Sequence, residues 1–224
     1  MVSDTTKDKN PASVRQPVKS FVDGVASPSA APGAGSVSAL VASLSAALTT
    51  MVCGLTVNRK SYAHVSEEMR RVLNESAELK DQLANLAEKD VEAYDEVSRA
   101  YHLRNVCGIT DEECQDALNA ALLNASEIPL QVARAAKRIL ALALIAAEKG
   151  NINAVCDAGV AALLADTAVQ SARLTVQLNL APVPPGPRKE AMLAELKSIL
   201  GDTAGVSEAV VQLVQKRIGG TSLF

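Results

Sequence analysis

Apolar side chains recur every three or four residues along most of the chain, which is the spacing of one face of an α-helix. The longest such segment runs from Ser66 to Leu103. Its stripe contains, in order, Met69, Val72, Leu73, Ser76, Leu79, Leu83, Leu86, Ala93, Tyr94, Val97 and Tyr101. Because most other positions are polar, the segment predicts a long amphipathic helix with one face on a core.

Local signals divide the rest of the chain into further helices. The uncharged segment from Ser36 to Asn58 follows a loop rich in Pro, Gly, Ser and Ala. Thr110-Asp111-Glu112-Glu113 is a capping box, and Lys149-Gly150 is a stop signal for the helix between them. Pro129 predicts a kink or break in that helix beside Ile128. The predicted helices span residues 18–25, 36–58, 66–103, 110–149, 153–180, 188–200 and 203–218.

The composition agrees with an all-α fold. Of the 224 residues, 48% are hydrophobic, 38 are alanine and only five are aromatic. Such a chain must fill its core with small aliphatic side chains, and closely packed helices do this well because alanine has the highest helix propensity. We therefore predict a single up-and-down bundle of long helices over residues 16–224, preceded by a polar, disordered segment at 1–15.

Charge and residue types argue against several functional classes. The formal net charge is −3 and tryptophan is absent, so neither a phosphate backbone nor stacked bases are favoured as partners. The segment Ser36–Asn58 is long enough to cross a membrane, but its many hydroxyls favour the centre of a helical bundle. The four cysteines show no short paired spacing, which predicts free thiols, no metal site and a cytoplasmic location.

Two carboxylates stand out by their position. Asp90 occupies the apolar stripe between Leu86 and Ala93, so the helical spacing points it inward. Asp157 is the only charged residue between Gly150 and Asp166, and a lone carboxylate on an apolar helix needs a partner, a proton or a cavity. Its alternative interpretation is a first-turn acid near the start of its helix. The pattern predicts two internal acids that could face one cavity.

Other candidate positions lie at helix ends. The loop Pro32-Gly33-Ala34-Gly35-Ser36 precedes a helix N-terminus, where free N–H groups suit an anion or a polar ligand. Arg59, Lys60 and Tyr62 follow the same helix and could bind carboxylates or form a solvated helix end. Asn179 could equally be a helix C-cap. None of these features alone identifies a substrate.

Four blocks together resemble the cyclodeaminase/cyclohydrolase family. They are SFVDGVASPSAAPGAGSVSALVASLSAALTTMVCGLTVNRKSY (20–62), KDVEAYDEV (89–97), SEIPLQVA (126–133) and KGNINAVCDAGVAALLA (149–165), in family order. The resemblance implies an all-helical fold that forms a homodimer and binds tetrahydrofolate derivatives in a cleft near the subunit interface, without a metal. Its implied reaction is hydrolysis of 5,10-methenyltetrahydrofolate to 10-formyltetrahydrofolate, or closure of formimidoyltetrahydrofolate with release of ammonia.

The resemblance also implies roles for individual residues. Asp90 and Asp157 match acids of the family pattern and would be the catalytic pair, with Asp157 as base and Asp90 as acid or cation stabiliser, or the reverse. The ligand-binding positions implied by the same match are Gly33, Gly35, Ser36, Lys60, Tyr62 and Asn179.

The sequence departs from the family pattern at three places. Ala34 replaces a glycine, Thr175 replaces an asparagine, and a Pro-Lys pair is missing near Arg104. These departures leave open a third hypothesis, a catalytically inactive protein that keeps the fold and binds folate or a partner.

Overall fold

The structure of the protein is a computed structural model that describes residues 16–107 and 112–219. Within these ranges it contains α-helices and two short 3₁₀ helices and no strand. The elements in chain order are α1 (Val18–Val25), α2 (Ala34–Val57), η1 (Lys60–Val65), α3 (Ser66–Cys107), α4 (Glu112–Lys149), η2 (Ile152–Ala154), α5 (Val155–Leu180), α6 (Pro187–Thr203) and α7 (Val206–Arg217). The predicted all-α fold is confirmed. Residues 1–15, predicted to be disordered, lie outside the described ranges.

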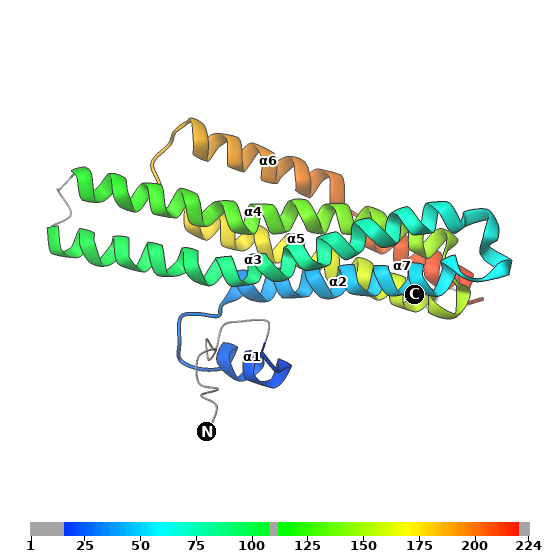
Figure 1. The fold of residues 1–224 in the computed structure, drawn as a ribbon. Helices are drawn as coiled ribbons and strands as arrows, with labels where there is room; N and C mark the ends of the chain where they lie inside the picture. Colours follow the sequence, from blue (N-terminus) through cyan, green and yellow to red (C-terminus); the bar gives the residue numbers. More distant parts are fainter. Residues whose placement is uncertain (1–15, 108–111, 220–224) are drawn as a thin grey trace, which may run out of the picture.

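Four long helices form the bundle. α2 packs on α3 and α5, α4 packs on the same two helices, and successive long helices run in opposite directions (Figure 1). α6 lies along the outer side of α4, while α7 packs on α5 near the opposite end of the molecule. The helix borders agree with the sequence prediction to within a few residues.

Alanine fills much of the core. α2, α4 and α5 bring together alanines whose side chains are fully buried, namely Ala39, Ala42, Ala46, Ala133, Ala136, Ala143, Ala146, Ala147, Ala158, Ala161, Ala162, Ala165, Ala168 and Ala172. A methyl group lets two helix backbones approach more closely than a leucine would, and protein interiors tolerate few voids. The close contact of these three helices therefore depends on small side chains at the helix faces that meet.

The hydroxyls of α2 are satisfied inside the bundle. Thr49 and Thr56 each donate to the carbonyl oxygen four residues earlier, and Ser45 donates to the carbonyl of Ala161 in α5 at 2.6 Å. Two helical segments, Ala34–Val57 and Ile152–Leu180, are long and apolar enough to cross a membrane by length and composition, with mean hydropathies of 1.9 and 1.5. Here they pack against each other, as the core-helix interpretation of Ser36–Asn58 predicted.

α4 passes through Pro129 as one continuous helix, so of the predicted kink or break beside Ile128 the break is wrong. Proline removes one helix hydrogen bond and crowds the preceding turn. Pro129 is buried, and the helix is held on both sides of it by contacts with α3 and α5. This tertiary packing offsets the local preference for a helix end.

Ion pairs fasten α6 to α4. Arg134 bonds through two nitrogens to the carboxylate of Glu195 and also to Glu127, while Lys137 pairs with Asp202. Beneath them, Met192, Leu196 and Ile199 of α6 are buried against the bundle. The apolar contact is the larger stabilising contribution, because exposed ion pairs usually contribute about 1 kcal/mol or less. The pairs fix how α6 lies on α4.

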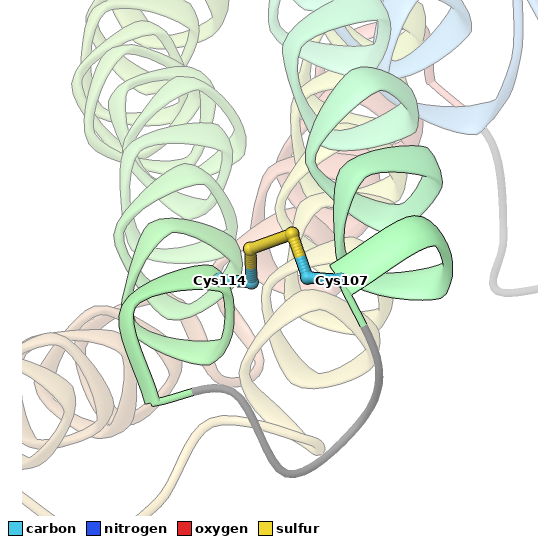
Figure 2. Close-up of a disulfide and its surroundings, with 2 residues drawn as sticks. All are labelled: Cys107 and Cys114. Carbon is cyan, nitrogen blue, oxygen red and sulfur yellow. A yellow bond between two sulfur atoms is a disulfide. The ribbon is translucent and has the colours of Figure 1, made fainter.

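A disulfide joins Cys107 at the end of α3 to Cys114 in the first turn of α4 (Figure 2). The prediction of four free thiols was therefore wrong for this pair. Spacing along the chain failed to reveal it because the two helices turn back on each other and bring the Cα atoms to 6.7 Å. Cys53 and Cys156 remain free, and burial raises the pKa of the Cys53 thiol to about 12.

The disulfide predicts a specific alkylation pattern. Unfolded but unreduced protein should take up two iodoacetamide groups, at Cys53 and Cys156, whereas reduced protein should take up four. Intact-mass spectrometry before and after reduction measures this directly. Four labels without reduction would show that Cys107 and Cys114 are not joined, and a Cys114→Ser variant, with three labels in both states, is the control.

Candidate functional site

The N-terminus of α2 is capped by a side chain from another helix. Gly33, the N-cap residue, offers no side chain to the free N–H groups of the first turn. Asp90 of α3 takes its place: the Ser36 hydroxyl donates to Asp90 Oδ2 at 2.9 Å, and the backbone N–H of Ser36 donates to the same carboxylate. The inward orientation of Asp90 predicted from helical spacing is confirmed.

Gly35 makes room for this carboxylate. A β-carbon added to Gly35 would lie 1.9 Å from Asp90 Oδ1, which is far inside van der Waals contact. A glycine is therefore required by the close approach of Asp90 and not by an unusual backbone angle. In the Pro-Gly-Ala-Gly-Ser segment, Gly35 thus leaves space for the Asp90 carboxylate, and Ser36 donates a hydrogen bond to it.

Burial governs the protonation of Asp90. Loss of hydration raises the pKa of the carboxyl group above its ordinary value, and the two hydrogen bonds from Ser36 act in the opposite direction. The net shift is upward. A carboxyl group of this kind exchanges a proton closer to neutral pH than an exposed aspartate does, which suits acid–base chemistry.

Asp90 lies in the wall of a cavity of about 270 Å³. The cavity is bounded by the loop before α2, the first turn of α2, the middle of α3, one residue of α4 and the end of α5. Its lining residues are Ala30, Ala31, Gly33, Ala34, Gly35, Asp90, Ala93, Tyr94, Val97, Ala125, Thr175, Leu178 and Asn179. The structure therefore brings together four predicted site residues: Gly33, Gly35, Asp90 and Asn179.

Tyr94 is a cavity residue that sequence analysis assigned only to the apolar stripe. It lies one helical turn after Asp90, and 42% of its surface is exposed. The signal was available, because positions i and i+4 of a helix share a face. Its ring adds a flat apolar surface beside the carboxylate, and aromatic rings of this kind stack on planar ligands.

Lys60, Tyr62 and Asp157 lie at the other end of the bundle, whereas Ser36 lies beside Asp90. Lys60 is exposed in η1, and the Tyr62 hydroxyl accepts a hydrogen bond from the backbone N–H of Ile152 at 3.0 Å. Asp157 is partly buried in the first turn of α5. It precedes Asn179 by 22 residues on the same helix, which corresponds to about 33 Å along the axis. Within one chain, Asp90 and Asp157 do not share a cavity.

A second depression, of about 500 Å³, lies between α4 and α6 and is lined by Arg134, Lys137 and Arg138. Each of these cations is paired with a carboxylate, Arg138 with Glu75 and the others with residues of α6. Its charge is thus neutralised within the chain. Among the described residues, no three His, Cys, Asp or Glu side chains gather in a group that could hold a metal ion.

Comparison with known proteins assigns the family. Residues 17–198 match the family described as Formiminotransferase-cyclodeaminase, which covers most of the chain. The chain belongs to this family. The resemblance stated from the four sequence blocks is thereby confirmed.

Members of the formiminotransferase-cyclodeaminase family differ in length and name. The chain is 35% identical over 204 residues to a methenyltetrahydrofolate cyclohydrolase of Methylorubrum extorquens, covering 90% of this chain and 97% of that protein. It is 30% identical over 200 residues to the rat formimidoyltransferase-cyclodeaminase, covering 89% of this chain but 37% of the rat protein. A crystal structure of formiminotetrahydrofolate cyclodeaminase from Thermotoga maritima superposes with a TM-score of 0.82 at 30% identity, covering 91% and 98% of the two chains.

The contact between Gly35 and Asp90 predicts the outcome of a Gly35→Ala substitution. The new methyl group should push the carboxylate off Ser36, and we expect the free energy of unfolding to fall by about 1–2 kcal/mol, since the lost charged hydrogen bond outweighs the gain in helix propensity. Chemical denaturation measures the change, and a crystal structure shows the displaced side chain.

The matched control is Gly201→Ala in α6, where an added β-carbon meets nothing within 4 Å. That substitution should leave stability unchanged or raise it by up to about 1 kcal/mol. A Gly35→Ala protein in which Ser36 still bonds Asp90 would contradict the proposed steric role of Gly35.

Proposed function

We propose that the protein is a folate one-carbon enzyme that hydrolyses 5,10-methenyltetrahydrofolate to 10-formyltetrahydrofolate. The observation that carries the proposal is the partly buried carboxylate of Asp90, held by Ser36 in the wall of a cavity. The name and the nearly full-length match of the Methylorubrum extorquens relative support the choice of substrate.

The substrate's charge suits this carboxylate. Methenyltetrahydrofolate carries a delocalised cation over its bridging carbon and two nitrogens, which an ionised Asp90 stabilises by charge. Water adds to the bridging carbon and gives up a proton, and one carbon–nitrogen bond then breaks as the departing nitrogen takes up a proton. A carboxyl group whose pKa is raised by burial can take part in such transfers, which typically contribute about 10²- to 10⁴-fold in rate.

The cavity offers contacts for a planar ligand. Tyr94 and Leu178 provide apolar surface, and Thr175 and Asn179 add a hydroxyl and an amide one helical turn apart. We infer that the ring system of the folate lies between these side chains with its reactive carbon beside Asp90. Ala34 and Thr175, which depart from the family pattern, both line the cavity and so belong to the ligand surface.

The homodimer predicted from the resemblance would complete the site. α2 and α5 carry outward stripes of exposed apolar side chains at helical spacing: Leu44, Met51, Leu55, Val160, Leu163, Leu174 and Leu178. Contiguous apolar surface of this kind favours association. A two-fold axis perpendicular to these helices makes the partner's helices antiparallel, which carries the Asp157 end of one subunit to the Asp90 end of the other.

In this arrangement, basic residues accompany Asp157. Arg59 and Lys60 are exposed beside Tyr62 at the same end of the bundle, where they would bind the carboxylates of the folate's glutamate tail. Asp157 would then act as the base and Asp90 as the acid or cation stabiliser, with the two roles open to exchange. No step requires a metal ligand from these residues.

A stand-alone cyclodeaminase is the second candidate function. The similarity to the Thermotoga maritima cyclodeaminase, which the chain matches over 98% of its length, favours it. Closure of formimidoyltetrahydrofolate would use the same cavity and release ammonia, so detection of ammonia distinguishes the two reactions. An inactive, folate-binding protein would bind ligand without turnover.

The cytoplasmic location inferred from the sequence stays a prediction. Thiols usually stay reduced in the cytoplasm. The Cys107–Cys114 disulfide is therefore the structural feature against which a measured cellular location should be checked.

Loss of the Asp90 carboxylate should abolish most of the activity. We expect the purified protein to hydrolyse methenyltetrahydrofolate well above the buffer rate, and Asp90→Asn to lower kcat/KM by at least about 100-fold, since an amide exchanges no proton and carries no charge. Decay of the substrate's near-ultraviolet absorbance measures both. Asp95→Asn, an exposed change on the same helix, is the control. Turnover of neither folate by the unaltered protein would contradict both enzyme proposals.

A shared site predicts complementation between inactive subunits. When Asp90→Asn and Asp157→Asn chains are co-expressed, random pairing makes half the dimers mixed, and each mixed dimer holds one unaltered site. Activity should therefore return to about a quarter of the unaltered level. Two separately purified variants that stay inactive after mixing and refolding would show that the acids do not meet across subunits.

A further inference from the structure

Ser36 donates its hydroxyl to Asp90, yet it does not line the cavity. Its surface is 0% exposed, and it is absent from the lining that includes Gly35 and Asp90. The family resemblance implied a ligand contact for Ser36, but a ligand in the cavity would meet Asp90 first. The Ser36 hydroxyl therefore bonds the Asp90 carboxylate from the side of α2 and not from the cavity.

We infer that Ser36 is a positioning residue for Asp90, fixing one carboxylate oxygen against the first turn of α2 so that Asp90 faces the folate in a single orientation. This inference rests on the proposed function for its catalytic consequence. Its geometric basis is the 2.9 Å hydrogen bond from Ser36 Oγ to Asp90 Oδ2, between residues 54 positions apart in the chain.

The bond differs from those of other hydroxyls on α2 because its acceptor is a carboxylate; Ser43 and Ser45 also bond neighbouring helices, but through backbone carbonyls of α3 and α5. Ser38, Thr49 and Thr56 donate to carbonyl oxygens of their own helix one turn earlier. Such bonds satisfy a buried hydroxyl and have little effect on another helix. Ser36 instead joins α2 to α3 through a charged group, and hydrogen bonds to ionised acceptors are about twice as strong as neutral ones.

Three features together restrict the carboxylate. Gly35 leaves space on one side, the Ser36 hydroxyl and backbone N–H hold it to the helix start, and burial removes competing water. Without the hydroxyl, the side chain loses one of its donors and gains freedom to rotate. The ionised form also loses stabilisation, so protonation of Asp90 moves to higher pH.

Few other groups of the same chain face this carboxylate, and the charged groups that a second subunit would add in the proposed dimer are identical in the two variants compared below. Among the described residues that line the cavity, Tyr94 is the only titratable one besides Asp90; the lining residues of α2, α4, α5 and the loop before α2 are uncharged. On α3 itself, Glu88 and Lys89 precede Asp90, and Lys89 is exposed. A shift caused by Ser36 should therefore be visible against a simple background.

The test is a comparison of Ser36→Ala with Ser38→Ala in the hydrolysis of methenyltetrahydrofolate at several pH values. Ser38 lies on the same helix, is 2% exposed and donates at 2.6 Å to the carbonyl of Ala34, so both variants lose one buried hydroxyl. We expect Ser36→Ala to lower kcat about 10- to 100-fold with KM within about two-fold. The limb of the pH profile that belongs to Asp90 should move to higher pH. Ser38→Ala should change none of these.

The decisive comparison is to make Ser36→Ala in the Asp90→Asn protein as well. If Ser36 works through Asp90, then Ser36→Ala should have no further effect in the Asp90→Asn protein, because their effects are not additive. A raised KM with an unmoved pH profile would overturn the inference and indicate direct ligand contact. If Ser36→Ala lowered kcat by the same factor in the unaltered protein and in the Asp90→Asn protein, that result would also overturn the inference.

Failure of the proposed function is distinguishable from failure of this inference. If the unaltered protein turns over neither folate, the Asp90 carboxyl group can still be titrated by carbon-13 NMR in unaltered, Ser36→Ala and Ser38→Ala proteins. An upward shift confined to Ser36→Ala supports the positioning role without reference to any substrate. An unmoved titration rejects it.

Discussion

The close packing of alanine faces is the constraint on which the structure depends. α2, α4 and α5 bring many fully buried alanines to the core, which lets these three helices pack closely. The cavity lies where the start of α2 and the end of α5 meet the middle of α3, with one residue of α4. A substitution that enlarges the core moves whole helices, because alanine has no alternative rotamer with which to adjust.

The same constraint explains why the candidate chemistry sits at helix ends. Side chains within the bundle are mostly apolar, whereas the first turn of α2 has free N–H groups that need an acceptor. Asp90 supplies it from α3, and in doing so becomes a partly buried carboxylate beside a cavity. One residue thus completes a helix terminus and offers a proton-exchanging group. The stability of α2 and the chemistry of the pocket are linked through this side chain.

Much of this organisation could be predicted from sequence, and the failures have physical causes. Helical spacing identified α3 and the inward position of Asp90, because one face of a long helix must be buried. Pro129 misled because packing from neighbouring helices outweighs a local preference. Sequence spacing does not show which helix ends lie side by side in the folded chain. It therefore revealed neither the Cys107–Cys114 disulfide nor the separation of Asp90 from Asp157.

The disulfide has a topological consequence. Cys107 and Cys114 enclose the connection between α3 and α4 in a covalent ring, so the two long helices stay joined even where the chain between those cysteines is cut. A protease acting there would yield two fragments that migrate as one molecule until a reductant separates them. An unbroken peptide chain between Cys107 and Cys114 is therefore not needed to hold the two halves of the bundle together. Circular permutants of the protein could exploit this property.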